Sequence, residues 1–212
     1  MSTSDNNESF CPETIDPMSD VRAGLVREVG YLATWSVSSC ESVPMILKQL
    51  SIKQFKSIFK KIYLEHAGFG VDRLRDGSTE TYWQSCGQLP HLVNIQFKRK
   101  TIVSDIYIYV NHKLDESYTP NIISVRAGIN FNDLQEVELV ELLKPYGWIR
   151  IKIKDIRNFP LKTHLLQIAV LKNYKNGNNC HIRLIKIHSP VSTNSFLGNF
   201  STVEMQQYTT IK

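Results

Sequence analysis

Two short polar stretches hold the side chains best suited to binding. Residues 115–120 have the sequence Asp-Glu-Ser-Tyr-Thr-Pro, and residues 176–181 have the sequence Asn-Gly-Asn-Asn-Cys-His. Small polar side chains of this kind donate and accept hydrogen bonds in tight turns, and an aromatic side chain such as Tyr118 adds contact area. Such loops suit an extended peptide or a sugar. The alternative is that each loop satisfies only its own backbone.

The sequence lacks the motifs of common enzymes. It contains no G-x-x-x-x-G-K-S/T, G-x-G-x-x-G, G-x-S-x-G or H-E-x-x-H pattern. The histidines show no spacing that would gather ligands around a metal ion. They are His66, His91, His112, His164, His181 and His188. We therefore expect a protein that is not an enzyme and that holds no metal and no cofactor.

An acidic loop and an aromatic pair allow two readings each. Asp72, Asp76 and Glu80 together offer oxygen ligands for calcium, but two neighbouring arginines are close enough to neutralise them, so a solvated loop is favoured. Tyr82 and Trp83 offer contact area for a ligand. Because the pair lies beside a glycine turn, we favour a role in closing the end of the folded domain.

Charge and cysteine content narrow the possible environments. The net charge of the 212 residues is +5, but residues 1–20 hold five acids and no Lys or Arg, while residues 41–67 hold five Lys and two Glu. The basic excess is therefore local. Cys11, Cys40, Cys86 and Cys180 are widely spaced, which favours free thiols over disulfides. With no secretory signal and no long apolar run, we expect an intracellular, soluble protein.

Alternating apolar residues dominate residues 21–190. Ile149, Ile151 and Ile153 alternate with Arg and Lys, as in a strand with one buried face. Residues 165–171 are almost all apolar, which is typical of a central strand covered on both faces. The other predicted strands are residues 92–97, 105–110, 123–128 and 181–188, the last ended by Pro190. Many short strands separated by turn residues predict an all-β sandwich or jelly roll.

Three segments depart from this pattern. Residues 1–20 are acidic and turn-rich, and we expect a disordered leader. Residues 41–67 form an atypical insertion whose helical period over 45–63 predicts a Lys-rich amphipathic helix. That helix would pack on the domain edge or bind a membrane or a partner, or the segment is translated noncoding sequence. Residues 191–212 form a C-terminal tail, either a frayed end or a peptide for a partner's groove.

Several long motifs resemble one family. They are REVG at 27–30, TWSVSSC at 34–40, residues 68–101, DESYTP at 115–120, QIAVLKNYKNG at 167–177 and IRLIKIHSPV at 182–191. These stretches resemble the Doc domain, and more narrowly the subunit-ten (Doc1) family of the anaphase-promoting complex. The resemblance covers residues 21–212 apart from the 41–67 insertion.

The resemblance implies both a fold and a role. The fold is a galactose-binding-like jelly roll over residues 21–190, in a nuclear and cytoplasmic ubiquitin ligase. The family's subunit is not the catalyst. It acts with a WD40 activator as a co-receptor for the destruction box of cell-cycle substrates, and it raises processivity. The implied partners are tetratricopeptide-repeat and scaffold subunits, the activator and the substrates, with no nucleic acid and no membrane.

The resemblance also implies particular site residues. Those for substrate binding are Ser117, Asn176, Asn178, Asn179 and His181, and those for docking to a tetratricopeptide-repeat subunit are Ile211 and Lys212.

The chain departs from the family pattern at three of these positions. Asn178 and Asn179 stand where the family usually has Arg and Asp, and Lys212 stands where it has Arg. A lost charge-assisted hydrogen bond is worth roughly 1.5–3 kcal/mol, so weaker substrate binding is expected. The main alternative function is a carbohydrate-binding module on the same fold. A third hypothesis is membrane or nucleic-acid binding through the Lys-rich helix.

Overall fold

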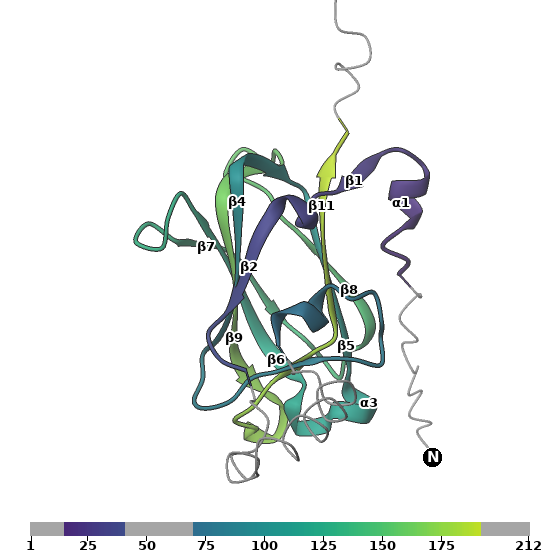
Figure 1. Ribbon diagram of the computed structural model, residues 1–212, viewed down its shortest axis with the longest axis vertical. Coiled ribbons are helices and arrows are strands. Elements are labelled where there is room, and N and C mark those ends of the chain that lie inside the picture. Colours follow the sequence, from purple (N-terminus) through teal and green to yellow (C-terminus); the bar gives the residue numbers. More distant parts are fainter. Residues whose placement is uncertain (1–14, 41–69, 192–212) are drawn as a thin grey trace, which may run out of the picture.

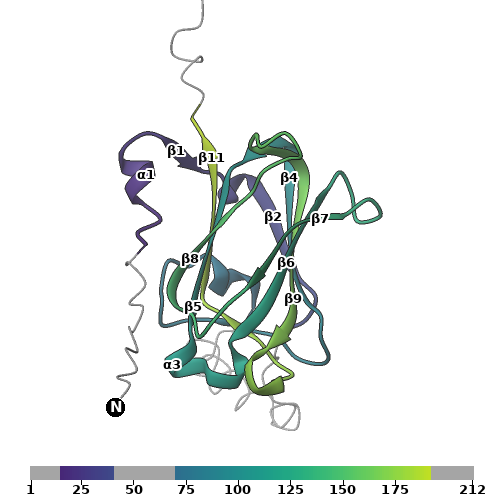
Figure 2. The same cartoon turned by 180° about the vertical axis from the view of Figure 1, so that it is seen from behind.

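Two antiparallel sheets face each other and enclose the core (Figures 1 and 2). The computed structural model describes residues 15–40 and 70–191. The five-stranded sheet has the order β2 (Ala33–Val37), β4 (His91–Val103), β9 (Leu161–Asn173), β6 (Pro120–Gly128) and β7 (Gln135–Glu141). The four-stranded sheet has the order β1 (Val26–Glu28), β11 (Leu184–Pro190), β5 (Asp105–Asn111) and β8 (Tyr146–Lys152).

Short elements close the ends of this sandwich. A two-stranded ribbon pairs β3 (Trp83–Gln84) with β10 (His181–Ile182). The helical turns are α1 (Ser19–Arg22), η1 (Gly30–Leu32), η3 (Val71–Leu74), α3 (His112–Asp115), η4 (Glu116–Tyr118) and η5 (Tyr174–Asn176). Among the described helices, none has the length and apolar character needed to cross a membrane.

The core is built from the alternating apolar residues of both sheets. Ile151 and Ile153 are buried, as their alternation with basic residues predicts. The central position predicted for residues 165–171 is confirmed, because β9 pairs with β4 on one side and β6 on the other. The other strands contribute the rest of the buried cluster, including Val93, Ile95, Phe97, Ile106, Ile108, Val110, Ile123 and Val125. Burial of about 25 cal/mol per Å² of apolar surface makes this cluster the main source of stability.

One strand prediction needs correction. Residues 181–188 do not form one strand: the chain breaks at Arg183, so that β10 pairs with β3 while β11 pairs with β1 and β5.

The strand β5 is covered on both faces. Tyr107, on the face opposite Ile106 and Ile108, is buried as they are. Its ring lies 4.8 Å from that of His188, and the guanidinium of Arg150 lies over its face. The outer side of this strand is therefore covered by aromatic and cationic side chains.

The segments outside the sandwich are described only in part. Of the predicted leader, residues 15–20 are described, and Ser19 and Asp20 belong to α1. The 41–67 insertion and the tail beyond Val191 lie outside the described residues. Cys40, Cys86 and Cys180 are free thiols.

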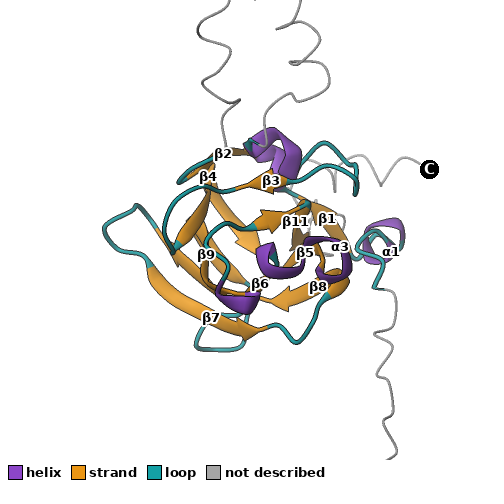
Figure 3. Ribbon diagram, turned by 90° about the horizontal axis from the view of Figure 1, so that it is seen from below, coloured by secondary structure: helices purple, strands orange, loops and turns teal. Residues whose placement is uncertain are grey.

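The strand register defines two ends of the molecule. Asp105 pairs with His188 and with Lys152, so the beginning of β5 and the ends of β11 and β8 lie together. The opposite end carries α3 and η4, which follow β5, and η5, which follows β9. Figure 3 looks onto that second end, where helical turns lie across the mouth of the sandwich. The two polar loops predicted to bind a ligand both belong to this end.

Candidate functional site

The first loop leaves β5 through a capped helical turn. The side-chain oxygen of Asn111 accepts hydrogen bonds from the backbone amides of Lys113 (3.1 Å) and Leu114 (3.2 Å), which begins α3. Glu116 then has a positive φ of 37°, which reverses the chain. Such a conformation is costly for a residue other than glycine, so it persists only where neighbouring contacts hold it. The reversal leaves Tyr118 at the mouth of the sandwich, 40% exposed.

In the second loop, residues 174–180, the backbone carbonyls of residues 177–180 are directed inward. The side-chain amide of Asn173 donates to the carbonyls of residues 177 and 179, and the ring of His91 is bonded to the carbonyl of residue 178. The carbonyl of residue 180 accepts from the amide of Ser85 at 3.0 Å. The backbone is thus fixed from within, while the side chains of Asn176 and Asn178 are exposed.

The two loops hold each other in place. The backbone amide of Tyr174 donates to the carbonyl of Thr119 at 3.0 Å. Lys175, which has a positive φ of 50°, forms an ion pair of 2.8 Å with Glu116. Gly177 packs so closely on the backbone of Ser117 that a Cβ atom at this position would overlap the Ser117 carbonyl oxygen. Three residues with positive φ therefore meet here, namely Glu116, Lys175 and Asn176.

A buried charge cluster lies beneath the loops. The guanidinium of Arg183 donates two hydrogen bonds to the carboxylate of Asp115, at 2.9 and 3.0 Å, and a third to the carbonyl of Thr79 at 2.7 Å. Nδ1 of His181 lies 3.1 Å from the same carboxylate. The His181 ring is stacked between Tyr82 (4.2 Å between centroids) and Tyr118 (4.3 Å). The ring of Tyr118 is therefore packed on His181, which is in turn packed on Tyr82 and bonded to the Asp115 carboxylate of the bidentate ion pair.

The electrostatics of the cluster favour an ionised Asp115. Burial raises the pKa of this carboxyl, but the hydrogen bonds from His181 and Arg183 outweigh burial and hold the pKa below its ordinary value. A negative charge is thus retained in the buried layer. The thiol of Cys180, next to His181, is fully buried, and burial raises its pKa well above the ordinary value. Cys180 is therefore a packing residue and has no nucleophilic character.

The structure brings most of the sequence-predicted site residues together. Ser117, Asn176, Asn178 and Asn179 belong to the two loops in contact, although Ser117 and Asn179 are half-buried. His181 is only 7% exposed and its Nε2 is buried. Its ring stacks on that of Tyr118, and its part in substrate binding stays a prediction. The predicted docking residues Ile211 and Lys212 lie outside the described residues.

Three further residues near this end have roles that the structure makes clear. Trp83 is fully buried and donates to the carbonyl of Ser39 at 2.9 Å, so it closes the sandwich end as favoured. Tyr82 belongs instead to the aromatic stack. Arg183 and its pairing with Asp115 were not predicted, because only the fold brings together residues 68 positions apart.

The acidic loop makes internal contacts. The carboxylate of Asp76 is bound by the Ser78 amide (2.9 Å) and the Thr81 hydroxyl (2.6 Å), with Arg73 at 3.4 Å. Over residues 15–40 and 70–191, no group of three His, Cys, Asp or Glu side chains is arranged to hold a metal ion.

Two facing antiparallel sheets around one core make this domain a jelly roll. Solved carbohydrate-binding domains have the same fold. A family 32 CBM from C. perfringens NanJ, in complex with galactose, has a TM-score of 0.56 at 12% identity over 78% of this chain and 100% of that one. The C-terminal domain of a chitobiase from Bacteroides fragilis has a TM-score of 0.53, also at 12% identity, over 78% of this chain and 100% of that one. At such identities the likeness concerns the fold.

The sequence comparisons identify the family. A family model described as "Anaphase-promoting complex, subunit 10 (APC10)" matches residues 62–210. A relative named anaphase-promoting complex subunit 10 from Drosophila melanogaster is 47% identical over 93% of this chain and 90% of its own length. Its Homo sapiens counterpart is 45% identical over 95% and 96%. This chain belongs to the family of subunit 10 of the anaphase-promoting complex, and its jelly roll is the Doc domain.

Proposed function

We propose that this chain is a non-catalytic substrate-recognition and processivity subunit of its complex, and that its loop end holds the destruction box of cell-cycle proteins. One observation carries the proposal. The two loops fix each other through their backbones, so that Tyr118 and the amides of Asn176 and Asn178 face outward at one end. Such side chains can bond to an extended peptide backbone while the tyrosine supplies contact area.

The rigidity of the surface supports a binding role. Hydrogen bonds hold the carbonyls of residues 177–180, and His181 holds the Tyr118 ring. A surface that is already ordered loses little conformational entropy when a peptide binds. The exposed groups are neutral amides and a phenol, with Glu116 paired to Lys175. The proposed ligand is therefore held by directional hydrogen bonds and one aromatic contact more than by net charge.

The proposed partners follow from the same family role. A WD40 activator would hold the other part of the destruction box, and Ile211 with Lys212 would dock on a tetratricopeptide-repeat subunit. The Lys212 ammonium is a point charge that cannot form the two parallel bonds of an arginine. Ile211 would supply the apolar contact of this docking. The complex would work in the nucleus and the cytoplasm.

The first prediction tests the loop end. The double variant Tyr118→Ala with Asn178→Ala removes the aromatic contact and one amide, and each truncation of an interface contact costs on the order of 1–2 kcal/mol. Added to a recombinant complex that lacks its own subunit 10, this variant should yield roughly tenfold less multiply ubiquitinated destruction-box substrate. Incorporation into the complex should equal that of the unmodified chain. Lys113→Ala, at an exposed lysine on α3, is the matched control.

A reciprocal variant makes the test sharper. Asn178→Arg with Asn179→Asp restores the charges usual in the family and should strengthen substrate binding by roughly 1.5–3 kcal/mol. Processivity that stays unchanged in both double variants, with normal incorporation, would refute the proposed site.

A further inference from the structure

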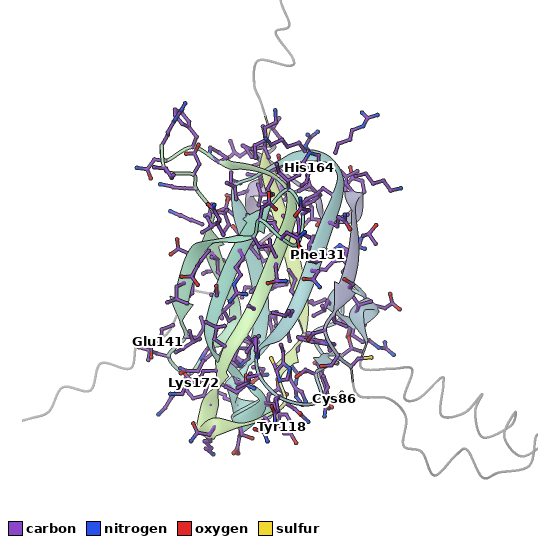
Figure 4. The ribbon with its side chains drawn as sticks, turned by 90° about the vertical axis from the view of Figure 1, so that its left-hand side faces the viewer. Cys86, Tyr118, Phe131, Glu141, His164 and Lys172 are labelled. Atoms are coloured by element: carbon purple, nitrogen blue, oxygen red, sulfur yellow. The ribbon has the colours of Figure 1, made fainter. Side chains whose placement is uncertain are left out.

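The end opposite the loops carries a groove that the proposed function does not use. It has a volume of about 520 Å³ and lies between the turn that joins β6 to β7, the loop of residues 153–160 and the beginning of β9. Its apolar wall includes Ile129, Val137, Ile156 and Leu161. A second hollow of about 340 Å³ adjoins it and shares Ile129. Figure 4 shows His164, which lines the second hollow, far from Tyr118 and Cys86 at the loop end.

Large apolar side chains around this groove are exposed to solvent. The side chain of Ile156 is completely exposed, and those of Ile129 and Phe159 are 63% and 65% exposed. Phe131, on the same turn as Ile129, is also exposed. Exposed apolar side chains gathered in one place, with a polar rim, are typical of protein-binding surfaces. None of these four residues is needed to close the core of the sandwich.

The rim of the groove carries lysine side chains that form no ion pair with the described residues. Lys100, Lys154 and Lys162 line it, and none of them forms an ion pair with a described residue. Lys98, Arg99 and Arg157 are exposed nearby and are likewise without an ion pair in the described part of the chain. Six cations are therefore available to an incoming ligand.

The carboxylates that line the groove are already engaged. Asp133 accepts from the backbone amides of residues 129 and 130, and Asp155 accepts from those of residues 157 and 159. Glu136 accepts from the hydroxyl of Ser124 at 2.6 Å. These acids stabilise their own turns and strand. These bonds leave the carboxylates charged, so the three acids and the three lysines of the lining balance each other. The surplus positive charge around the groove comes from Lys98, Arg99 and Arg157, and it favours a ligand that carries negative charge.

We infer that this groove docks an extended segment of another subunit of the complex, one that carries Asp or Glu side chains around an apolar anchor. The anchor would lie against Ile129 and Ile156, and the acids would meet Lys100, Lys154 and Lys162. Nucleic acid fits less well, because its interfaces are polar, whereas this groove has an apolar wall that would stay uncovered. The register places the groove at the end where β11 stops, so this docking leaves the loop end open.

A photo-cross-linking experiment tests the occupant directly. The full chain with benzoylphenylalanine at position 156 is assembled into a recombinant complex that lacks its own subunit 10, and a short DNA duplex is added as a competitor probe. The matched control carries the same group at position 143. Leu143 is 84% exposed and follows β7 at the loop end. We expect position 156, and not position 143, to cross-link to an Asp/Glu-rich segment of another subunit.

A charge-reversal pair supplies the second measurement. Lys100→Glu, Lys154→Glu and Lys162→Glu together should weaken incorporation roughly tenfold or more, and added salt should weaken incorporation of the unmodified chain. The control reverses Lys113, Lys144 and Lys172, which are exposed lysines outside the groove. Unchanged thermal unfolding would show that both triple variants are folded.

Each contrary outcome overturns the inference. A cross-link from position 156 to residues 1–14 of the same chain would make the acidic leader the occupant. A cross-link to the DNA duplex would make the groove a nucleic-acid site. A cross-link from position 156 to only a neutral or basic segment would also rule out a docked acidic segment. So would the absence of any cross-link from position 156 together with normal incorporation of the triple charge-reversal variant. These outcomes test docking of the groove through cross-linking and incorporation. The proposed function of the loop end is tested separately, by processivity at normal incorporation.

Discussion

At the scale of single residues, the ion pair between Arg183 and Asp115 stabilises the candidate site. Both side chains are 5% exposed, and the guanidinium makes three direct hydrogen bonds to protein oxygen atoms. Taking two charges out of water costs several kcal/mol per ion, and good geometry is needed to offset that cost. The net worth of such a pair is small, whereas removal of one partner leaves an unpaired buried charge.

Arg183→Met provides the residue-scale prediction for stability. Methionine keeps much of the volume but leaves the Asp115 carboxylate with only His181 as a side-chain partner, so we expect a loss of about 3–5 kcal/mol in the free energy of unfolding. Urea denaturation followed by fluorescence measures the loss. Lys175→Met, which breaks the ion pair to Glu116 on the surface, is the control, and its unfolding curve should be unchanged. Equal losses in the two variants would contradict the importance of burial.

The same cluster predicts a pH dependence. The pKa of Asp115 is lower in the folded protein than its ordinary value of 3.8, so ionised Asp115 adds stability above that pH. The contribution is lost as the pH falls from 3.8 through the lower folded pKa. The difference in melting temperature between the unmodified chain and Asp115→Asn should therefore narrow between about pH 5 and pH 2. A difference that stays constant over this range would show that the carboxyl titrates normally.

At the scale of elements, the contact between η4 and η5 depends on one missing side chain. Gly177 has an ordinary φ of −60°, so the glycine is required by the closeness of the Ser117 backbone and not by its own conformation. The two loops could not pack in this way around any larger residue. A turn of the chain 60 residues away therefore determines where the Ser117 backbone lies.

Gly177→Ala should separate the two loops. We expect a loss of about 1–3 kcal/mol in the free energy of unfolding, as for other overpacked sites, together with weaker binding of a destruction-box peptide. Asn178→Ala, at an exposed position of the same turn, is the control for unfolding and should change stability by less than about 0.5 kcal/mol. An alanine variant with normal stability and normal peptide binding would show that the loops adjust independently.

The elements also show which features the sequence reveals. Strands with a buried face and a solvated face, such as β4, β8 and β6, follow from alternation because each face has one environment. β9 follows from its unbroken apolar run. The break at Arg183 leaves one trace, the adjacent apolar residues Leu184 and Ile185, which interrupt the alternation of residues 181–188 where the partner strand changes. The burial of Tyr107 depends on side chains from β8 and β11.

For the candidate site, the sequence predicted which loops take part but not how their side chains pack. The resemblance to a family and the local pattern of polar residues in tight turns led to two loops that lie in contact in the structure, and their role in binding stays a prediction. That His181 would be buried in an aromatic stack was not predictable, because Tyr82 and Tyr118 lie 99 and 63 positions away. Long-range contacts of this kind follow from topology and leave no periodic trace in the sequence.

At the scale of the whole molecule, two separate ends have separate chemistry. The two contacting loops present amides and a phenol and are held by backbone bonds, whereas the groove at the opposite end has an apolar wall and a lysine rim. Val191, where the described chain stops, also lies at that opposite end. Two antiparallel sheets with one buried cluster connect the ends rigidly. A change at one end should therefore leave the geometry of the other intact.

Deletion of Ile211 and Lys212 tests this separation. The buried cluster of the described residues lies between Val29 and Ile187, so we expect thermal unfolding of the isolated chain to be unchanged while incorporation into the complex falls. Size-exclusion chromatography of the reconstituted complex measures incorporation. Normal incorporation of the deletion variant would contradict the proposed docking of Ile211 and Lys212 on a tetratricopeptide-repeat subunit. A lower melting temperature of the deletion variant would show that the tail stabilises the sandwich.

The inward bonding of the carbonyls at residues 177–180 has a kinetic consequence. A surface that needs no rearrangement associates with its ligand at an ordinary docking rate, about 10⁵–10⁷ per molar per second, whatever the ligand's side chains. Substrates that share this surface would then differ mainly in how long they stay. A subunit of this design would rank its substrates by residence time, and each extra contact would lengthen the interval available for successive modifications.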